Sequence, residues 1–507
     1  MLCHPPVLAK IQSAGLLGVE AYQVWTEVEV GPGLPGYHLV GLAAGAVREG
    51  GVRVRAAIVH SGFKLPPRKI TVNLAPADVR KDGAAFDLPI AIGVLAGLEI
   101  VPTPALAGVL LLGELSLDGS VRAITGSLPV AILARRLGVR ALVLPAKCAA
   151  EAAGLTDLPV FAVESLAEVV GFLNGATTLR RAEEVDSTGD DTEDDLSEVA
   201  GQRAAKFALE IAAAGGHNLL LVGPPGTGKS MLARRVPTIL PPLDEAEMLE
   251  TSAIYSVAGK LQSGLCRRRP FRAPHHDISI PGLIGGGPFP QPGEISLAHH
   301  GVLFLDELPE FRGQALEALR QPLEERAITI ARARAVVRFP ASFCLVGAMN
   351  PCPCGYYGAP NRACTCDTGR VARYRRRISG PLLDRFDMHV YVPPVSLAQL
   401  TEEAHEESST LVRQRTVAAR TIQQKRLGPK RANAHMQGKE IRKWCAIDQT
   451  STRHLERVAK QRGISARAIH RILRVARTVA DLRGAEKLEA ADLQLAVEFR
   501  CLDEALQ

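Results

Sequence analysis

The sequence predicts an α/β protein of about three domains, and three observations lead to this class. Strand-like and helix-like segments alternate over residues 1–175, a glycine-rich loop joins an apolar strand to a helix near residue 223, and the chain after residue 395 is helical. Of its 507 residues, 47% are hydrophobic and 22% are charged. These fractions are those of a globular protein and exclude a disordered chain, a fibre and a coiled-coil rod.

The first predicted domain spans residues 1–180. β-Branched runs at 70–74 and 141–144 predict strands, and the stretches 84–96 and 128–137 predict helices. The alternation favours an α/β or α+β arrangement.

Charge is distributed unevenly along the chain. Residues 181–198 are predicted to be an acidic linker, because a stretch this rich in carboxylates cannot bury enough apolar surface to fold alone. Residues 413–477 contain 18 Lys and Arg, so the formal net charge of +7 hides a strongly basic block. This block indicates contact with a polyanion.

The chain contains no apolar run long enough to predict a transmembrane helix, and residues 1–15 lack the pattern of a secretory signal. Four of its ten cysteines are clustered. In a large chain without a signal, clustered thiols indicate metal or redox chemistry rather than disulfides. We therefore expect a cytoplasmic protein that does not enter the membrane.

A phosphate-binding loop follows the apolar strand 219–222. Its motif G-x-x-x-x-G-K-S is formed by Gly223, Pro224, Pro225, Gly226, Thr227, Gly228, Lys229 and Ser230. Backbone N–H groups of such a loop surround phosphates at a helix N-terminus, Lys229 reaches the β- and γ-phosphates, and Ser230 ligates Mg²⁺. The motif predicts an ATP and Mg²⁺ site.

Polar residues also follow two later strands. The apolar run 302–305 ends at Asp306, which would hold Mg²⁺ through water, and Glu307, which would polarise the attacking water. The strand 343–349 ends at Asn350, whose side chain can orient that water, although an Asn at a strand end is more often a turn residue. Arg385 and Arg467 could each stabilise γ-phosphate charge, but the residues alone do not select them among 60 basic ones.

Four cysteines form one loop over residues 352–366. They are Cys352, Cys354, Cys364 and Cys366. Four thiolates are the ligand number that tetrahedral Zn²⁺ requires, and the alternative is four reduced thiols without a metal. The loop follows Asn350 directly, so a structural zinc ion would stiffen the segment that leads to Arg385.

The motifs GPPGTGKS, VLFLDE, AMNPCPCG, GPLLDRFD and SARAIHRILRVART occur in this order and resemble the magnesium-chelatase-like AAA+ ATPases of the ComM/YifB family. The stretches VRVRAA, ITVNLAPAD and GELSLDG in the first domain support the same resemblance. It implies a Lon-protease-like, ribosomal-S5-like α+β domain, an AAA+ P-loop α/β core over 199–395 and a helical lid over 396–507.

The resemblance implies roles for the matched positions. Lys229 and Ser230 correspond to the Walker A pair, Asp306 and Glu307 to Walker B, and Asn350 to sensor 1. These assignments agree with the chemistry expected from the residues themselves.

Arginines and a hairpin receive roles by the same resemblance. Arg385 corresponds to an arginine finger offered to a neighbouring subunit's ATP, and Arg467 to a sensor 2 arginine acting on its own subunit's ATP. A finger acting between subunits implies a homohexameric ring. In the hairpin 327–338, Arg332 and Arg334 could share one face of the ribbon and meet DNA in the pore, the alternative being a solvated face.

A second insertion carries four histidines. His275 and His276 precede the glycine-rich stretch 281–287, and His299 and His300 follow it. The cluster suggests a metal site, but the glycines favour a mobile pore loop whose His275 and His276 contact DNA phosphates.

The first domain is expected to lack protease activity. In the Lon-like fold that the family implies, Ala85 occupies the place of the nucleophilic serine and Leu128 that of the lysine base. Neither side chain can perform these roles.

Together these features predict an ATP-hydrolysing hexameric motor that acts on single-stranded or branched DNA. The family implies branch-migration helicase activity in natural transformation and recombination, with recombination proteins as further partners. Two alternatives stay open at this point: a magnesium-chelatase-type ATPase subunit, and an ATP-dependent regulator of a protein partner.

Overall fold

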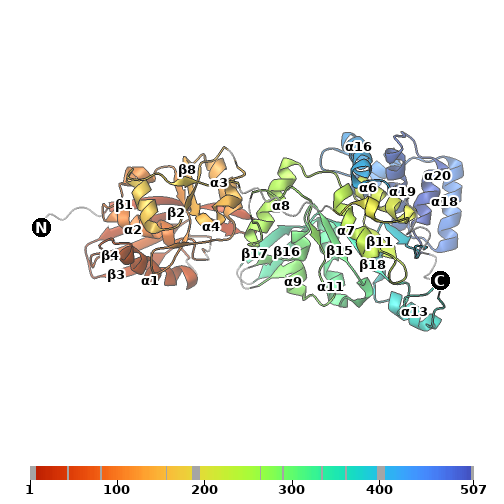
Figure 1. Ribbon diagram of the computed structural model, residues 1–507, viewed down its shortest axis with the longest axis horizontal. Coiled ribbons are helices and arrows are strands. Elements are labelled where there is room, and N and C mark those ends of the chain that lie inside the picture. The colour runs from red at the N-terminus through yellow and green to blue at the C-terminus, as the bar shows by residue number, and fades with distance from the viewer. Residues whose placement is uncertain are drawn as a thin grey trace. The chain divides into compact units, whose positions relative to one another are not determined.

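The computed structural model describes residues 7–42, 45–79, 81, 83–155, 157–184, 194–262, 264–287, 290–332, 335–359, 362–396 and 406–503. The chain forms two compact units. The first comprises Met1–Gly189 and Met248–Cys266, and the second comprises Asp190–Glu247 and Arg267–Gln507. The chain therefore crosses from one unit to the other at three places, and Figure 1 traces it by colour.

An eight-stranded mixed sheet forms the frame of the first unit, with the order β10-β9-β8-β5-β1-β2-β4-β3. β1 and β2 pair antiparallel from Val7↔Val30 to Leu17↔Glu20, and alternate apolar residues bury one face of the pair. The strands are β1 (Val7–Leu17), β2 (Glu20–Gly31), β3 (Gly36–Val40), β4 (Lys69–Ala75), β5 (Val109–Leu111), β8 (Ala141–Pro145), β9 (Val160–Val163) and β10 (Arg180–Arg181). A small hairpin, β6 (Glu114–Leu115) and β7 (Val121–Arg122), lies outside this sheet.

The principal helices of this unit are α1 (Gly45–His60), α2 (Asp87–Gly97), α3 (Ser127–Leu137), α4 (Ala146–Ala149) and α5 (Leu166–Leu173). Every residue of α2 is buried, because the helix packs against β1 and β2 and α1 packs on it. Gly93 permits this close approach, since a Cβ there would lie 2.4 Å from Cγ2 of Val28. The buried Asp87 is compensated by Arg53, whose Nε lies 2.6 Å from Oδ2.

Residues 248–266 belong to the first unit, although in sequence they lie between the phosphate loop and Asp306. Most of α8 (Glu245–Val257) is therefore part of this unit. Ser256 Oγ donates to Glu151 Oε2 (2.5 Å) and accepts from the Leu128 N–H (3.2 Å). Burial raises the pKa of Glu151 to about 7. The sequence did not predict these two hydrogen bonds, which join residues more than 100 positions apart.

A five-stranded parallel sheet forms the centre of the second unit, with the order β12-β15-β18-β11-β19. The strands are β12 (Phe271–Arg272), β15 (Val302–Leu305), β18 (Cys344–Met349), β11 (Leu219–Val222) and β19 (Met388–Tyr391). β11, β15 and β18 are buried along their whole length, as strands covered by helices on both faces are. The carboxyl ends of neighbouring parallel strands meet at one edge, where the phosphate loop begins.

Helices cover this sheet, and the C-terminal helices pack beside them. α16 packs against α6 and α7, and α19 packs against α6 (Figure 1). The longer helices are α6 (Arg203–Gly215), α7 (Lys229–Ile239), α13 (Thr368–Arg375), α16 (Ser409–Leu427), α17 (Gly438–Trp444), α18 (Gln449–Arg462), α19 (Ala466–Leu482) and α20 (Ala490–Glu498). Shorter helices are α9 (Ile280–Ile284), α10 (Glu294–Leu297), α11 (Gly313–Ala318), α12 (Arg320–Glu325) and α14 (Gly380–Leu383).

The predicted fold class is confirmed: an N-terminal α+β unit, a parallel α/β core and a helical C-terminal part. The predicted hairpin segment 327–338 is formed by β16 (Ala327–Arg332) and β17 (Ala335–Pro340), which pair antiparallel. Of the predicted linker, residues 185–193 lie outside the described residues, whereas Leu196 is buried in the core of the second unit. Within the described part of the chain, no helix is long and apolar enough to span a membrane.

Candidate ATP-binding site

The predicted phosphate loop leaves the buried strand β11 and enters α7 at Lys229. Gly226 (φ 76°) and Gly228 (φ 82°) adopt left-handed conformations that glycine takes without strain. Gly223 lies so close to β19 that a Cβ there would come within 2.2 Å of the Val392 carbonyl oxygen. These constraints direct the loop around the space in which phosphates would bind.

Lys229 is nearly buried and closes this loop. Its Nζ donates to the carbonyl oxygens of Gly223 (2.7 Å) and Pro224 (2.8 Å) and to Asn350 Oδ1 (3.3 Å). Burial lowers the pKa of Lys229 to about 8, against the opposing charges of Asp306 and Glu307. A phosphate group would favour the charged ammonium, so the site is prepared for an anion.

The two acidic residues after β15 lie beside the start of α7. Ser230 Oγ donates to Asp306 Oδ2 (2.6 Å), and the Glu307 N–H donates to Asp306 Oδ1 (2.9 Å). Glu307 has a left-handed backbone (φ 50°), and its side chain is 58% exposed. The hydroxyl and carboxylate oxygens of Ser230 and Asp306 are the ligand types that Mg²⁺ takes, so these residues fit the ion.

A cavity of about 300 Å³ opens at this edge of the sheet. Ser230, Asp306 and Glu307 line it together with His275, His276 and, from α7, Arg234. His276 Nδ1 lies 3.7 Å from Glu307 Oε2. Sequence reasoning missed Arg234 at this site, although its spacing of one helical turn after Ser230 was the available signal.

Arg385 lies in a different cluster of charges. It forms an ion pair with Glu324, and burial together with the positive charges of Arg471, Arg467 and Arg320 lowers its pKa. The charge of Arg467 thus acts on Arg385, so the two arginines belong to one cluster of charges.

Asp387 explains this arrangement. Its carboxylate accepts from Arg471 Nη1 (3.1 Å), one helical turn after Arg467 on α19, and from the Asn218 N–H (3.0 Å) beside β11. Burial alone would raise the pKa of Asp387, but a hydrogen bond with His217 and the charge of Arg471 hold it well below its usual range. This buried ion pair joins the loop that carries Arg385 to the helix that carries Arg467.

Family models for three parts of the magnesium chelatase subunit ChlI match this chain: one over residues 26–148, one over 195–400, and a C-terminal one over 406–500. YifB of Salmonella typhimurium, an uncharacterized protein, is 44% identical over 98% of both chains. The competence protein ComM of Haemophilus influenzae is 44% identical over 99% of both chains. The chain belongs to the magnesium-chelatase-like ComM/YifB family.

As a member of this family, the chain is an AAA+ ATPase. The 67 kDa magnesium-chelatase subunit of Heliobacterium mobile is a more distant relative, 24% identical over 60% of this chain and 46% of that subunit. The resemblance of the sequence to the ComM/YifB family is thus confirmed over nearly the full length.

The cysteine loop of this ComM/YifB family member brings its four thiols together. Cys352 Sγ lies 3.3 Å from Cys354 Sγ and 3.7 Å from Cys364 Sγ, and the Sγ atoms of Cys354 and Cys364 are 3.5 Å apart. All four Sγ atoms, including that of Cys366, lie within 4.8 Å of one another. Four sulfur ligands around zinc at 2.3 Å would be about 3.8 Å apart, so the cluster fits a tetrahedral ion.

The structure describes only some of the residues that the sequence predicts to contact DNA. Arg334 and the side chain of Arg332 lie outside the described residues. His275 and His276 stack at 4.1 Å between ring centroids beside Glu307, and their contact with DNA stays a prediction. His299 is buried, and its Nδ1 accepts from the Ser342 N–H (2.9 Å).

The first unit contains no serine–lysine dyad among its described residues. Ala85 and Leu128 stand at the positions expected for the two catalytic groups, and Leu128 is fully buried. Ser127 and Lys81, which lie close to these two positions in sequence, are both buried, and Lys81 Nζ has no hydrogen-bond partner within the described chain. The absence of protease activity stays a prediction.

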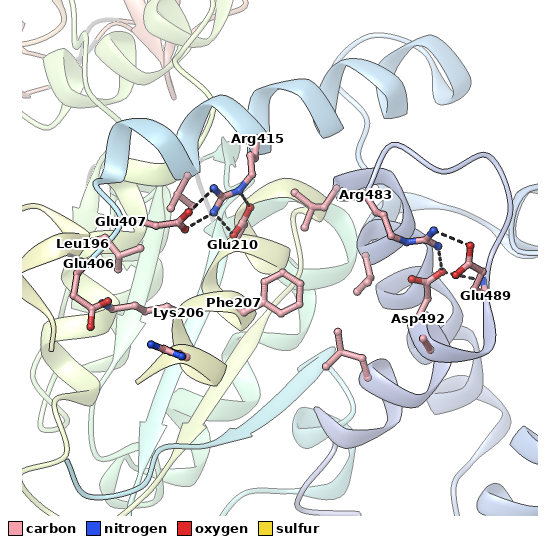
Figure 2. A pocket seen from close by; sticks show the side chains of 16 residues that line it. Leu196, Lys206, Phe207, Glu210, Glu406, Glu407, Arg415, Arg483, Glu489 and Asp492 are labelled. Carbon is pink, nitrogen blue, oxygen red and sulfur yellow. Dashed lines mark hydrogen bonds and ion pairs between the residues drawn. The ribbon is translucent and has the colours of Figure 1, made fainter. Parts of the chain in front are cut away.

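A larger cavity of about 710 Å³ lies between α6, α16, α19 and α20 (Figure 2). Figure 2 shows Arg415 between Glu210 and Glu407, with Nη2 2.7 Å from Glu407 Oε2. Lys206 pairs with Glu406 (2.7 Å), and Arg483 pairs with Glu489 and Asp492. Arg415, Lys206 and Arg483 thus already have carboxylate partners, and Arg203 is a further cation of the lining.

Proposed function

We propose that this chain is an ATP-driven motor that assembles as a cytoplasmic homohexamer and moves branched or single-stranded DNA. In this proposal it drives branch migration during natural transformation and recombination. The observation that carries the motor is the meeting of Lys229, Ser230, Asp306, Glu307 and Asn350 at one edge of the sheet.

Each residue has a distinct task in the proposed hydrolysis. Backbone N–H groups of the phosphate loop and Lys229 bind the β- and γ-phosphates. Ser230 and Asp306 would hold Mg²⁺, which neutralises phosphate charge. Glu307 accepts a hydrogen bond from the attacking water, and Asn350 orients that water toward the γ-phosphate.

The ring is supported by the cluster of charges that Arg385 and Arg467 share. The positive charge of Arg467 lowers the pKa of Arg385, and Asp387 and Arg471 join their two segments. We infer that both arginines act on the ATP of a neighbouring subunit. This extends the expected role of Arg385 to Arg467, which the sequence had assigned to its own subunit's ATP.

The DNA substrate is supported by two features. The relative from Haemophilus influenzae is named a competence protein, and the sequence of the hairpin segment 327–338 contains Arg332 and Arg334. Competence concerns the uptake and incorporation of DNA. An ATPase ring that encloses a DNA strand can move that strand during its incorporation.

Strand displacement tests this function. We expect the full-length protein with ATP and Mg²⁺ to displace a labelled strand from a forked or four-way DNA, and Lys229→Ala to abolish this because ATP is no longer held. Lys260→Ala, which removes a lysine outside the site, is the matched control. Equal displacement by wild type and Lys229→Ala, or none by either, would contradict the proposal.

We also propose that the four clustered thiolates hold a structural Zn²⁺. The ion would stiffen the loop 352–366, and it takes no part in hydrolysis. Protein purified without added metal should contain about one zinc per chain, and Cys354→Ser with Cys366→Ser should remove it. Less than about a tenth of an equivalent in the wild-type protein would contradict this site.

A further inference from the structure

The solvent-facing side of α13 (Thr368–Arg375) carries a row of arginines. Arg370, Arg373 and Arg376 are exposed and follow one another at a spacing of three residues. Val371, Tyr374 and Ile378 occupy the opposite side and are buried. Residues three apart on a helix are neighbours, about 5–6 Å between Cβ atoms, so the three guanidinium groups form one patch.

This charge is not neutralised by the protein. Among the described residues, the guanidinium groups of Arg370, Arg373 and Arg376 have no carboxylate partner. The nearest acid in sequence, Asp367, uses its carboxylate to accept from the Arg370 N–H (2.8 Å) and so caps the helix. Arg377 differs, because it pairs with Glu310 (2.7 Å).

The helix dipole explains only part of the row. Cations stabilise the last turn of a helix, which accounts for Arg373 and Arg375. Arg370 lies in the first turn of α13, where a positive charge is unfavourable. Arg370 therefore has no stabilising counter-charge among the described residues, and its charge is available to an anion outside the chain.

Tyrosines accompany these arginines. Three of the seven tyrosines of the chain, Tyr356, Tyr357 and Tyr374, lie within this short region. Tyr357 is 44% exposed, with the Arg375 guanidinium 5.3 Å from its ring centroid, and Arg362 lies 4.2 Å from the ring centroid of Tyr356. Tyr374 is buried and Tyr356 is half-buried, so Tyr357 is the exposed ring of the three. An exposed aromatic ring next to an arginine-rich helix is typical of surfaces that bind single-stranded nucleic acid.

We propose that Arg370, Arg373, Arg376 and Tyr357 form a contact surface for single-stranded DNA, in which the arginines bind successive phosphates and Tyr357 stacks on a base. This inference rests on the proposed function and assigns a DNA contact to a surface other than the hairpin β16–β17. RNA and acidic protein segments are the competing ligands, and the test separates them.

The surface is joined to the ATP site through the cysteine loop. Arg375 Nε donates to the Pro351 carbonyl oxygen (3.2 Å), directly after Asn350. At Gly355 (φ 88°), a Cβ would lie 2.7 Å from Cδ of Pro225 in the phosphate loop. The phosphate loop therefore lies against the segment that carries Tyr357, and this segment is hydrogen-bonded to α13.

The test compares two triple variants of the full-length protein. One is Arg370→Gln, Arg373→Gln and Arg376→Gln. The control is Arg453→Gln, Arg457→Gln and Lys460→Gln, which removes the same charge from exposed positions of α18. Binding of a labelled oligo-dT is measured by fluorescence anisotropy at several salt concentrations, together with ATP hydrolysis without DNA.

We expect the α13 variant to bind oligo-dT at least about tenfold more weakly than wild type, and the slope of log K against log salt to fall by about two. DNA-independent ATP hydrolysis should be unchanged. Tyr357→Ala should weaken binding about fivefold or more, whereas Tyr357→Phe should not, because it keeps the stacking ring. The charge-reversed variant with Glu at all three arginines should bind more weakly still.

Three results would overturn the surface. If the α13 variant binds oligo-dT like wild type while the α18 variant does not, DNA is held elsewhere and the proposed motor stands without this surface. If an RNA or an acidic polypeptide competes at least about tenfold better than oligo-dT for the wild-type surface, single-stranded DNA is not its ligand. If wild type binds no DNA under any salt condition, the proposed function fails and this inference fails with it.

Discussion

The arginines of residues 413–477 and those of residues 362–377 differ in what surrounds them. In the first region, Arg426 and Arg477 both contact the buried carboxylate of Asp481, and Arg415 contacts Glu210. In the second region, Arg370 and Arg373 face solvent without a carboxylate partner in the described chain. Both regions are basic in sequence, but several arginines of the first are paired with buried carboxylates, whereas the exposed row of the second has no such partner among the described residues.

The difference changes how the basic C-terminal block is interpreted. Its arginines largely join the C-terminal helices to one another and to the sheet, as when Arg420 donates to the carbonyl oxygens of Ala213 and Ala214 and Arg471 binds Asp387. Exposed cations remain on α18. Net charge therefore indicates that a polyanion is a partner, whereas burial and pairing indicate where it binds.

The largest expected effect concerns Arg467, the arginine of the block that we assign to catalysis between subunits. Lys229→Ala and Arg467→Ala should each abolish ATP hydrolysis when assayed alone. Mixed in equal amounts, they should regain activity, because about a quarter of the interfaces in a ring would combine an intact Lys229 with an intact Arg467. The rate of the mixture is compared with the rate of each variant.

If rings that contain both variants form but do not hydrolyse ATP, this assignment is contradicted. It would place Arg467 at the ATP of its own subunit. Arg385→Ala mixed with Lys229→Ala is the matched comparison, since the arginine finger is expected to complement in the same way.

The next effect concerns stability. Asp481→Ala leaves Arg426 and Arg477 without their buried counter-charge and should lower the free energy of unfolding of the second unit by about 3–5 kcal/mol. Denaturant titration followed by circular dichroism measures this change. Glu456→Ala, at an exposed position of α18, should change it by less than about 0.5 kcal/mol. A mild effect of Asp481→Ala would mean that these arginines are not structural.

The smallest effect is expected from the exposed cations of α18. The triple variant Arg453→Gln, Arg457→Gln and Lys460→Gln should change the affinity for oligo-dT by less than about threefold, because isolated exposed charges beyond the contact surface are screened by salt. Anisotropy titration at 0.15 M salt measures the change. A loss as large as that of the α13 variant would remove the contrast between the two regions.

The motifs of the ATP site could be predicted because each is local. The phosphate loop lies between its own strand and helix, and Asp306 and Asn350 each end a strand, so parallel neighbours place them together. The clustering of four cysteines was equally local, since they fall within one loop. Short-range spacing is enough for such sites.

Other features depend on pairs that are distant in sequence. Arg415 and Glu210 are 205 positions apart, and Ser256 and Glu151 are 105 apart. No spacing rule predicts which arginine of a basic block will find a carboxylate, or that residues 248–266 will leave the ATPase unit. The position of His276 beside Glu307 could likewise not be predicted, because His276 lies on a loop rather than at the end of a strand.

The most direct test of the central claim is the rate of ATP hydrolysis with and without forked DNA. We expect DNA to raise the rate of the wild-type protein several-fold, and Glu307→Gln to lower the rate by about 10²–10⁴-fold in both conditions because the attacking water is no longer polarised. A wild-type rate that is the same with and without DNA, at a DNA concentration that saturates binding, would contradict an ATP-driven DNA motor.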